Sequence, residues 1–223
     1  MQTYTVDIAG EPVTLPIVPI NHKLAISLLM VIDMGVRFGE RIGQALATKL
    51  RPLKPDIVVG AATLGIPVVI EVSRALGLDQ YVIAQKSPKI HLADALVQEL
   101  QSVTSAGKQR LMLDRRAVPL LAGRRVVVVD DVVATGSSLA ATLALARAAG
   151  AAVVGAGVIL TEGQDWEKTL GADAALVQGL ALLWQIYSRC FFTLIHMRQF
   201  GHRRGFDRMM RLTMASRMAG NVG

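Results

Sequence analysis

The stretch that decides the fold is Val126-Val127-Val128-Val129-Asp130-Asp131-Val132-Val133-Ala134-Thr135-Gly136-Ser137-Ser138, in a chain of 223 residues. Four consecutive valines are typical of a strand buried on both faces of a parallel sheet. Two acids follow at the carboxyl end of that strand, and a small, hydroxyl-rich turn then leads into a predicted helix over about 137–149. Open α/β sheets bind their ligands at this edge. The stretch therefore predicts a ligand site at the end of a central strand.

The turn after the two acids has the composition of a phosphate site. Consecutive backbone N–H groups and the positive end of the helix attract a phosphate. Gly136 allows close approach of the backbone, and Thr135, Ser137 and Ser138 add hydroxyl donors. The adjacent carboxylates suit a diol, with or without a bound Mg²⁺. Together they describe a site for a ribose 5-phosphate; the alternative is a tight strand–helix turn with two solvated acids.

The rest of the chain alternates short strands with helices. Further strands are predicted at 57–59, 81–84, 153–160 and 174–177, and a further helix at 66–76, closed by Gly77. This alternation predicts an α/β fold with a doubly wound, mostly parallel sheet. Ahead of it, 3–8 and 12–17 read as a small hairpin and 35–51 as an amphipathic helix, while 96–103 and 110–113 read as the arms of a flexible hairpin.

Composition separates the chain into a nearly neutral domain and a basic tail. The whole chain carries a formal net charge of +7, but residues 1–179 contribute only +1 and residues 180–223 contribute +6. A nucleic-acid-binding domain is therefore not expected. A single cysteine excludes a disulfide scaffold or a multi-cysteine metal site, and His22 and His91 have no ligand-spaced partners for zinc. The N-terminus has no signal-peptide pattern, so we expect a cytoplasmic protein.

We predict three regions: an N-terminal hood segment and helix (1–55), a binding core (56–179) and a tail (180–223) of uncertain structure. The apolar run 180–197 is interrupted by Arg189, which argues against a membrane-spanning helix. The tail is read as a surface or membrane-skimming helix, as a dimer contact, or as a segment with no selected structure. The last reading is favoured, and it predicts that truncation after Gly179 is tolerated.

At this point the sequence resembles the type I phosphoribosyltransferases, whose signature is four apolar residues, two acids and a short Thr-Gly-Ser/Thr turn. The resemblance runs from Asp56 to about Val177 and is closest to the adenine and xanthine branches. It implies a Rossmann-like fold with a small N-terminal hood. It also implies that Asp130 and Asp131 hold the ribose hydroxyls, with Mg²⁺, of phosphoribosyl pyrophosphate (PRPP). The residues from Ala134 to Ser138 (Ala134, Thr135, Gly136, Ser137, Ser138) would then bind its 5-phosphate.

Three more segments fit the resemblance. The turn Ala61, Ala62, Thr63, Leu64 and Gly65 is similar to the family's pyrophosphate loop, which often contains a cis peptide between non-proline residues. Lys86 resembles the family's pyrophosphate-binding lysine, although it also reads as an ordinary surface lysine. Lys108 and Arg110 belong to a segment, 102–110, that resembles the flexible loop closing over the substrates. Asp130, Asp131, Lys86, Lys108 and Arg110 are therefore the expected catalytic residues.

The base-binding side departs from the family pattern. Ala134 stands where hypoxanthine–guanine enzymes place an Asp, which favours the adenine side, but no acid lies between Val103 and Leu113 where adenine enzymes carry a Glu. Glu162 and Val132 are the expected base-binding residues. A carboxylate at 162 would accept from an exocyclic amino group and repel a carbonyl oxygen, although Glu162 also reads as an acid in a polar loop. Trp166 reads either as a base-stacking residue or as core.

The function expected from the resemblance is transfer of the phosphoribosyl group from PRPP to a nucleobase, with an adenine-like purine favoured, in purine salvage by a homodimer. Two alternatives stay open. One is a PRPP-binding regulator without catalysis, and the other is a phosphoribosyltransferase for a 6-oxopurine or a pyrimidine.

Overall fold

The computed structural model describes residues 2–19, 24–88, 94–100, 110–183 and 186–187. The chain divides into two compact units, residues 1–16 with 27–184 and residues 17–26 with 185–223. The described residues of the second unit are the last three of strand β2 (Glu11–Pro19), most of β3 (Leu24–Ser27, whose last residue belongs to the first unit) and β11 (Ile186–Tyr187). Strands β3 and β11 pair antiparallel. Among the described residues, no helix has the length and apolarity needed to span a bilayer.

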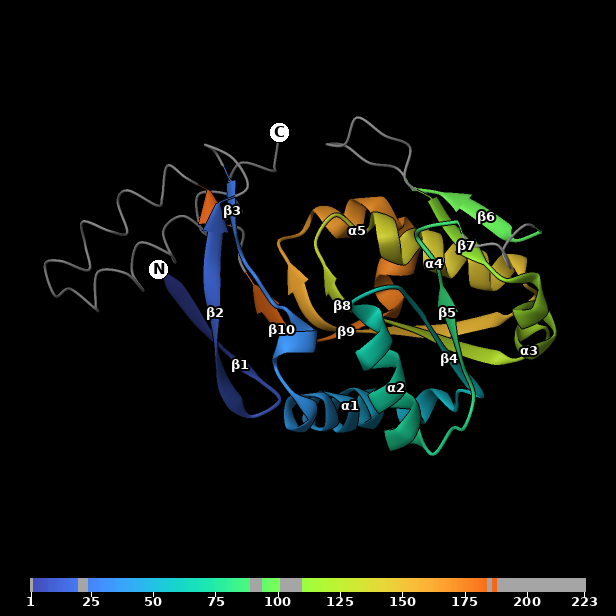
Figure 1. Ribbon diagram of the computed structural model, residues 1–223, viewed down its shortest axis with the longest axis horizontal. Coiled ribbons are helices and arrows are strands. Elements are labelled where there is room, and N and C mark those ends of the chain that lie inside the picture. The colour runs from blue at the N-terminus through green and yellow to red at the C-terminus, as the bar shows by residue number, and fades with distance from the viewer. Residues whose placement is uncertain (1, 20–23, 89–93, 101–109, 184–185, 188–223) are drawn as a thin grey trace, which may run out of the picture. The chain divides into compact units, whose positions relative to one another are not determined.

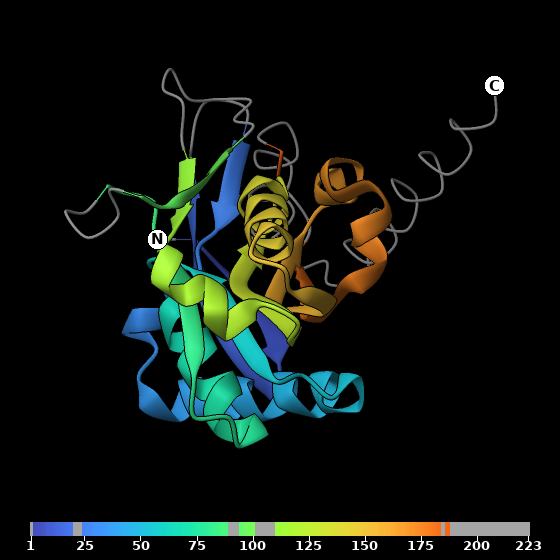
Figure 2. The same cartoon turned by 90° about the vertical axis from the view of Figure 1, so that its right-hand side faces the viewer.

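The first unit is built on a five-stranded parallel sheet in the order β10-β9-β8-β4-β5. Its strands are β4 (Ile57–Ala61), β5 (Tyr81–Ala84), β8 (Arg125–Val133), β9 (Ala152–Glu162) and β10 (Val177–Leu183). Helices α1 (Val36–Leu50) and α2 (Gly65–Leu76) cover one face, and α4 (Ser137–Ala148) and α5 (Asp165–Leu170) cover the other (Figures 1 and 2). The predicted doubly wound α/β fold is therefore confirmed.

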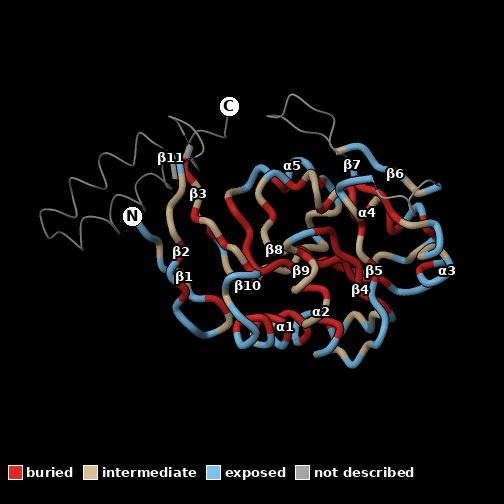
Figure 3. The backbone as a smooth tube through the Cα atoms, viewed as in Figure 1, coloured by how far each residue is buried: buried red, intermediate tan, exposed pale blue. Residues whose placement is uncertain are grey.

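The central strands separate two apolar clusters, because successive side chains of a strand point to opposite faces. In β8, Val126 and Val128 belong to the cluster under α4 and α5, whereas Val127 and Val129 belong to the cluster under α1 and α2. All five residues of β4 are buried as well, as Figure 3 shows. The valine run thus forms a strand buried on both faces, as its composition predicts.

The N-terminal hairpin belongs to the core of the first unit. Strands β1 (Thr3–Ile8) and β2 (Glu11–Pro19) pair antiparallel. Ile8, Val13 and Leu15 join the cluster on the α1–α2 face, together with Leu29 and Val31 from the segment before α1. These contacts place the hairpin on the face that carries α1 and α2; the hood that the family resemblance implies there stays a prediction.

The remaining elements are short. Strands β6 (Leu96–Glu99) and β7 (Arg110–Leu113) pair antiparallel, as predicted for the hairpin arms, while residues 101–109 between them lie outside the described ranges. Helix α3 spans Val118–Leu121, and 3₁₀ helices span Val31–Asp33, Arg51–Leu53, Arg115–Ala117 and Gly171–Leu176.

The last strand corrects the sequence prediction. The segment predicted as a strand at 174–177 falls mostly in the 3₁₀ helix Gly171–Leu176, and β10 begins only at Val177. It continues to Leu183, whose side chain is 2% exposed. The boundary predicted after residue 179 therefore lies inside β10, and truncation there would remove a buried leucine of the core.

Candidate active site

The topology brings two loops together at the carboxyl edge of the sheet. Strands β4 and β8 are neighbours, yet the chain continues from β4 toward β5 on one side and from β8 toward β9 and β10 on the other. At such a switch point the loops after the two strands diverge and leave room for a ligand. The two segments that the sequence predicts as site segments, residues 61–65 and 130–138, each run from the end of one of these strands into the loop that follows it.

Asp130 lies where these two segments approach each other. Its side chain is only 8% exposed, and its Oδ1 accepts a hydrogen bond of 3.0 Å from the backbone N–H of Asp131. A Cβ on Gly65, at the start of α2, would stand 3.0 Å from the same Oδ1. The carboxylate therefore lies against the first turn of α2, where any side chain at position 65 would push it away.

The pKa of Asp130 is changed by its burial and by the charges around it. Burial raises the pKa of Asp130 to about 8, the negative charge of Asp131 adds to the rise, and the ammonium group of Lys86 partly offsets it. Asp131 itself is half-buried at the end of β8. Two adjacent carboxylates with a cation in reach can bind hydroxyl groups and share a divalent cation.

The turn that leads into α4 presents a left-handed glycine and hydroxyl groups, which are features that suit a phosphate site. Gly136 has φ +82° and precedes the first helical residue, Ser137. The hydroxyl of Thr135 donates to Ser137 Oγ at 3.3 Å. Ser138 Oγ is buried and has no hydrogen-bond partner among the described residues. A bound anion would give that hydroxyl the acceptor that it lacks.

The loop after β4 approaches β8 at Asp130, on the other side of the switch point. The backbone N–H of Ala62 donates to the carbonyl of Ala84 at 2.8 Å, and α2 starts three residues later at Gly65. The peptide between Ala62 and Thr63 is cis, in agreement with the feature that the family resemblance implies. Thr63 is exposed, and Leu64 is half-buried.

The expected cationic residues are only partly described. Lys86 is exposed just after β5, and its charge acts on Asp130. Arg110 is exposed at the first position of β7. Lys108, His22 and His91 lie outside the described residues, so their predicted roles, or lack of one, stay predictions.

The expected base-binding residues lie on one face of the sheet. Val132 pairs in register with Leu160, and Glu162 pairs with Leu183. Register partners in neighbouring strands point to the same face, and both leucines belong to the cluster on the hood and α1 face. The half-buried Val132 packs against that cluster too.

Glu162 is not the loop acid that one reading of its sequence surroundings predicts. It is the last residue of β9 and is 6% exposed. Its carboxylate has no hydrogen bond or ion pair with any other residue of the described ranges, and burial raises its pKa. An ionised group so placed is costly unless a bound partner compensates for its lost hydration.

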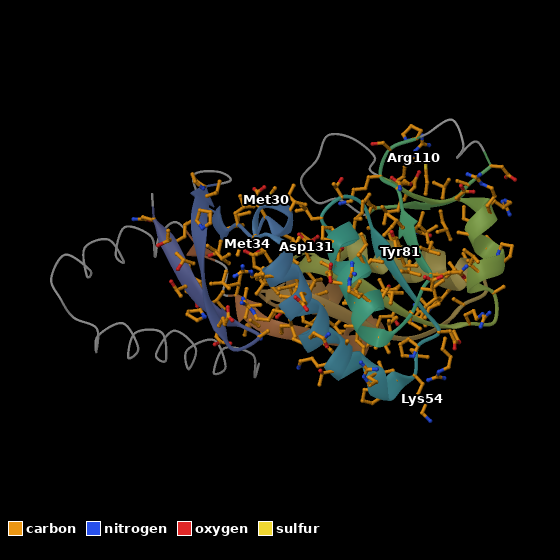
Figure 4. The ribbon with its side chains drawn as sticks, turned by 60° about the horizontal axis from the view of Figure 1, so that its bottom comes forward. Met30, Met34, Lys54, Tyr81, Arg110 and Asp131 are labelled. Carbon is orange, nitrogen blue, oxygen red and sulfur yellow. The ribbon has the colours of Figure 1, made fainter. Side chains whose placement is uncertain are left out.

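The sequence does not point to Met34, and it leaves the role of Trp166 open. Met34, just before α1, packs against the same cluster as Val132, and Figure 4 labels Met30, Met34 and Asp131 near the middle of the view and Lys54 at its lower right. Nothing in the periodicity of 28–34 marks these hood residues. Trp166 lies in α5, is 8% exposed and belongs to the cluster of the opposite face. The base-stacking interpretation of Trp166 is therefore wrong.

The donor set fits one kind of metal. Within the described ranges no group of three or more His, Cys, Asp or Glu side chains could hold a metal ion by itself. The pair Asp130 and Asp131 suits Mg²⁺, which keeps several waters and is usually bound by one or two carboxylates together with substrate oxygens.

Comparisons with known proteins agree with this geometry. The model of the phosphoribosyl transferase domain family matches residues 37–177. The chain is 27% identical over 165 residues to a xanthine phosphoribosyltransferase of Laribacter hongkongensis, covering 73% of this chain and 86% of the relative. It is 31% identical over 160 residues to an adenine phosphoribosyltransferase of Oenococcus oeni, covering 70% and 85%.

A solved structure supports the fold. An adenine phosphoribosyltransferase of Thermoanaerobacter pseudethanolicus superposes with a TM-score of 0.65 at 22% identity, over 76% of this chain and 95% of that one. The family model covers both loops of the switch point, because its match includes β4, β8 and the loops that follow them. On this evidence the chain belongs to the type I phosphoribosyltransferase family.

Proposed function

We propose that the protein transfers the 5-phosphoribosyl group from PRPP to a purine base and releases pyrophosphate. The observation that carries this proposal is the close approach of Asp130 to the first turn of α2, where a Cβ added at Gly65 would stand 3.0 Å from Asp130 Oδ1. This contact joins a diol-binding carboxylate pair to a second loop whose backbone can hold the leaving group, on the two sides of one switch point.

In the proposed complex the turn at the start of α4 holds the 5-phosphate. The N-terminus of this 12-residue helix attracts an anion, and the buried Ser138 hydroxyl donates to it. Asp130 and Asp131 accept hydrogen bonds from the ribose hydroxyls. The ribose is thereby fixed between the phosphate turn and the loop after β4.

The reaction breaks the bond between C1 of the ribose and a pyrophosphate oxygen, and forms a bond between C1 and a ring nitrogen of the base. Pyrophosphate leaves with the electron pair, and the proton of the ring nitrogen passes to solvent or phosphate. By analogy with glycoside cleavage, positive charge develops on the sugar ring, so stabilising the leaving group contributes much of the catalysis. The backbone of residues 61–65, Lys86, Arg110 and Lys108 would supply that stabilisation.

Mg²⁺, bound to Asp130 and Asp131 together with substrate oxygens, would neutralise charge on the pyrophosphate. The homodimer, the place in purine salvage and the cytoplasmic location belong to the same proposal, and the family membership is what supports them. Light scattering on the purified protein tests the dimer directly.

For the base we propose an amino-bearing purine, with adenine as the type. The support is Glu162, a carboxylate 6% exposed and without a described partner, on the same face as Val132. The N–H groups of an exocyclic amine would give it a hydrogen-bonded partner, whereas a 6-oxo group would place two acceptors against each other.

A second candidate function is a PRPP-binding regulator without catalysis. The feature that favours it is the absence of any acid between Val103 and Leu113, where the adenine enzymes carry a glutamate. Pyrophosphate release from PRPP in the presence of a nucleobase mixture, with the nucleotide product identified by mass spectrometry, separates the two. Binding of PRPP with no base-dependent release would support the regulator and contradict the enzyme.

A further inference from the structure

Helix α5 packs directly behind the phosphate turn. A Cβ on Gly136 would stand 3.0 Å from the carbonyl oxygen of Trp166 and 3.2 Å from both the Trp166 Cα and the Thr169 Cβ. Figure 1 shows α5 on the same face of the sheet as α4. Any movement of α5 toward or away from the sheet therefore changes the support of the turn at Gly136.

The side chain of Trp166 contacts the turn that follows β9. Its indole N–H donates to the carbonyl of Gly163 at 3.2 Å. The backbone N–H of Gly163 donates to the carbonyl of Leu183 at 2.9 Å, which ties the turn after β9 to β10. Gly163 directly follows Glu162, so the same two hydrogen bonds restrain the backbone that carries the buried carboxylate.

One residue thus contacts both turns with different atoms. The main chain of Trp166 supports the turn before α4, and its indole holds the turn that follows Glu162. The ring is 8% exposed and packed in the cluster with Leu139 and Leu170, so it has a fixed position from which to act. A rigid supporting residue is what keeps a binding group within the small tolerance that recognition requires.

We infer that Trp166 is a positioning residue that sets the orientation of Glu162 relative to the phosphate turn, and thereby the affinity and selectivity for the base. This inference rests on the proposed function. It assigns Trp166 no contact with substrate. Its role is to hold the base-binding turn in register with the site of the 5-phosphate.

The test compares Trp166→Phe with Thr169→Val in the full chain. Phenylalanine keeps an aromatic ring in the cluster and removes the N–H donor. Valine keeps the branched side chain beside Gly136 and removes only a hydroxyl that donates to the Asp165 carbonyl of the same helix at 3.4 Å. Steady-state kinetics give KM for adenine, KM for PRPP and the ratio of kcat/KM for adenine to that for hypoxanthine.

We expect Trp166→Phe to raise KM for adenine by about fivefold, the effect of one lost hydrogen bond, and to lower the adenine-to-hypoxanthine ratio. KM for PRPP should stay within about twofold of wild type, because the main-chain support of Gly136 remains. Thr169→Val should leave all three quantities unchanged. A wild-type KM and ratio for the base in Trp166→Phe would overturn the inference, since a merely structural role predicts a lower melting temperature with intact selectivity.

If Trp166→Phe does not fold, tryptophan fluorescence of a second variant tests the same inference. The chain has two tryptophans, so Trp184→Phe leaves Trp166 as the only indole fluorophore. Addition of ribose 5-phosphate should change its emission, and subsequent adenine should change it again. If the emission of Trp166 does not change in either step, the inference that Trp166 links the two turns is overturned. Absence of turnover by the wild-type enzyme with any base would instead contradict the proposed function.

Discussion

Asp130 and Glu162 are two buried carboxylates at the same edge of the sheet, and their surroundings differ. Asp130 is 8% exposed and has a backbone N–H, a second carboxylate and a lysine in reach. Glu162 is 6% exposed and has no polar partner among the described residues. Burial raises the pKa of both groups.

The protein itself supplies polar partners to Asp130, whereas the described residues supply none to Glu162. A buried charge needs compensation. Asp130 obtains part of it from Lys86 and the backbone, whereas Glu162 would obtain it only from a bound molecule that presents N–H groups. Substitutions at the first group should therefore lower turnover with every base, and those at the second should change which base is used.

The largest effect is expected at the ribose end. Asp130→Asn and Asp131→Asn should each lower kcat/KM for PRPP by about 10- to 100-fold, because each removes a charged hydrogen-bond acceptor worth about 1.5–3 kcal/mol. Steady-state kinetics measure the loss, and Asp79→Asn, at an exposed position, is the matched control. Wild-type kcat/KM in both site variants would show that the pair does not bind the ribose.

The next effect tests the base end. Glu162→Gln should lower the ratio of kcat/KM for adenine to that for hypoxanthine by about tenfold, because the amide N–H₂ can donate to a carbonyl that the carboxylate repels. KM for PRPP should not change. The control is Glu167→Gln, in the following helix and exposed. An unchanged ratio would show that Glu162 does not take part in selecting the base.

An effect of comparable size is expected at the phosphate turn. Gly136→Ala introduces a Cβ 3.0 Å from the Trp166 carbonyl at φ +82°, and a left-handed non-glycine residue costs about 1–2 kcal/mol. KM for PRPP should rise about 5- to 30-fold if the turn shifts to relieve that cost. Gly123→Ala shares the positive φ but has no atom within 4 Å, so it should lose stability and keep KM. Equal KM values for the two variants would contradict a phosphate role for this turn.

The smallest effect concerns stability and pH. Because the pKa of Glu162 is raised in the folded protein, the unfolded chain loses this proton first as pH rises above about 4.3. The contribution of Glu162 to the free energy of unfolding therefore falls with rising pH. Urea unfolding at about pH 5 and about pH 8 should show Glu162→Gln gaining stability over wild type at the higher pH. A difference that does not depend on pH would mean that Glu162 is compensated within the free protein.

Much of the ribose and phosphate end could be predicted from the sequence because its determinants are local. The valine run, the acids, the glycine and the hydroxyl residues follow one another within β8, its turn and α4, so strand, turn and helix signals coincide. The same holds for β4, its small-residue loop and α2. Their meeting at the switch point follows from the parallel order of the strands.

The base end depends on contacts between distant segments, which a sequence pattern does not show. The burial of Glu162 follows from the extension of β9 and its pairing with Leu183 of β10. That strand begins later than its short apolar run indicates, since runs of this length do not distinguish a strand from a helical turn. The position of Trp166 depends on how α5 packs against α4, which no periodicity within six residues determines.

The most direct test of the account is a steady-state assay of the wild-type chain with PRPP, Mg²⁺ and, in separate reactions, adenine, hypoxanthine, guanine, xanthine, uracil and orotate, following pyrophosphate release and the nucleotide product. The account predicts base-dependent release with the highest kcat/KM for adenine. Faster turnover of a 6-oxopurine would contradict the role given to Glu162, and no release with any base would contradict phosphoribosyl transfer itself.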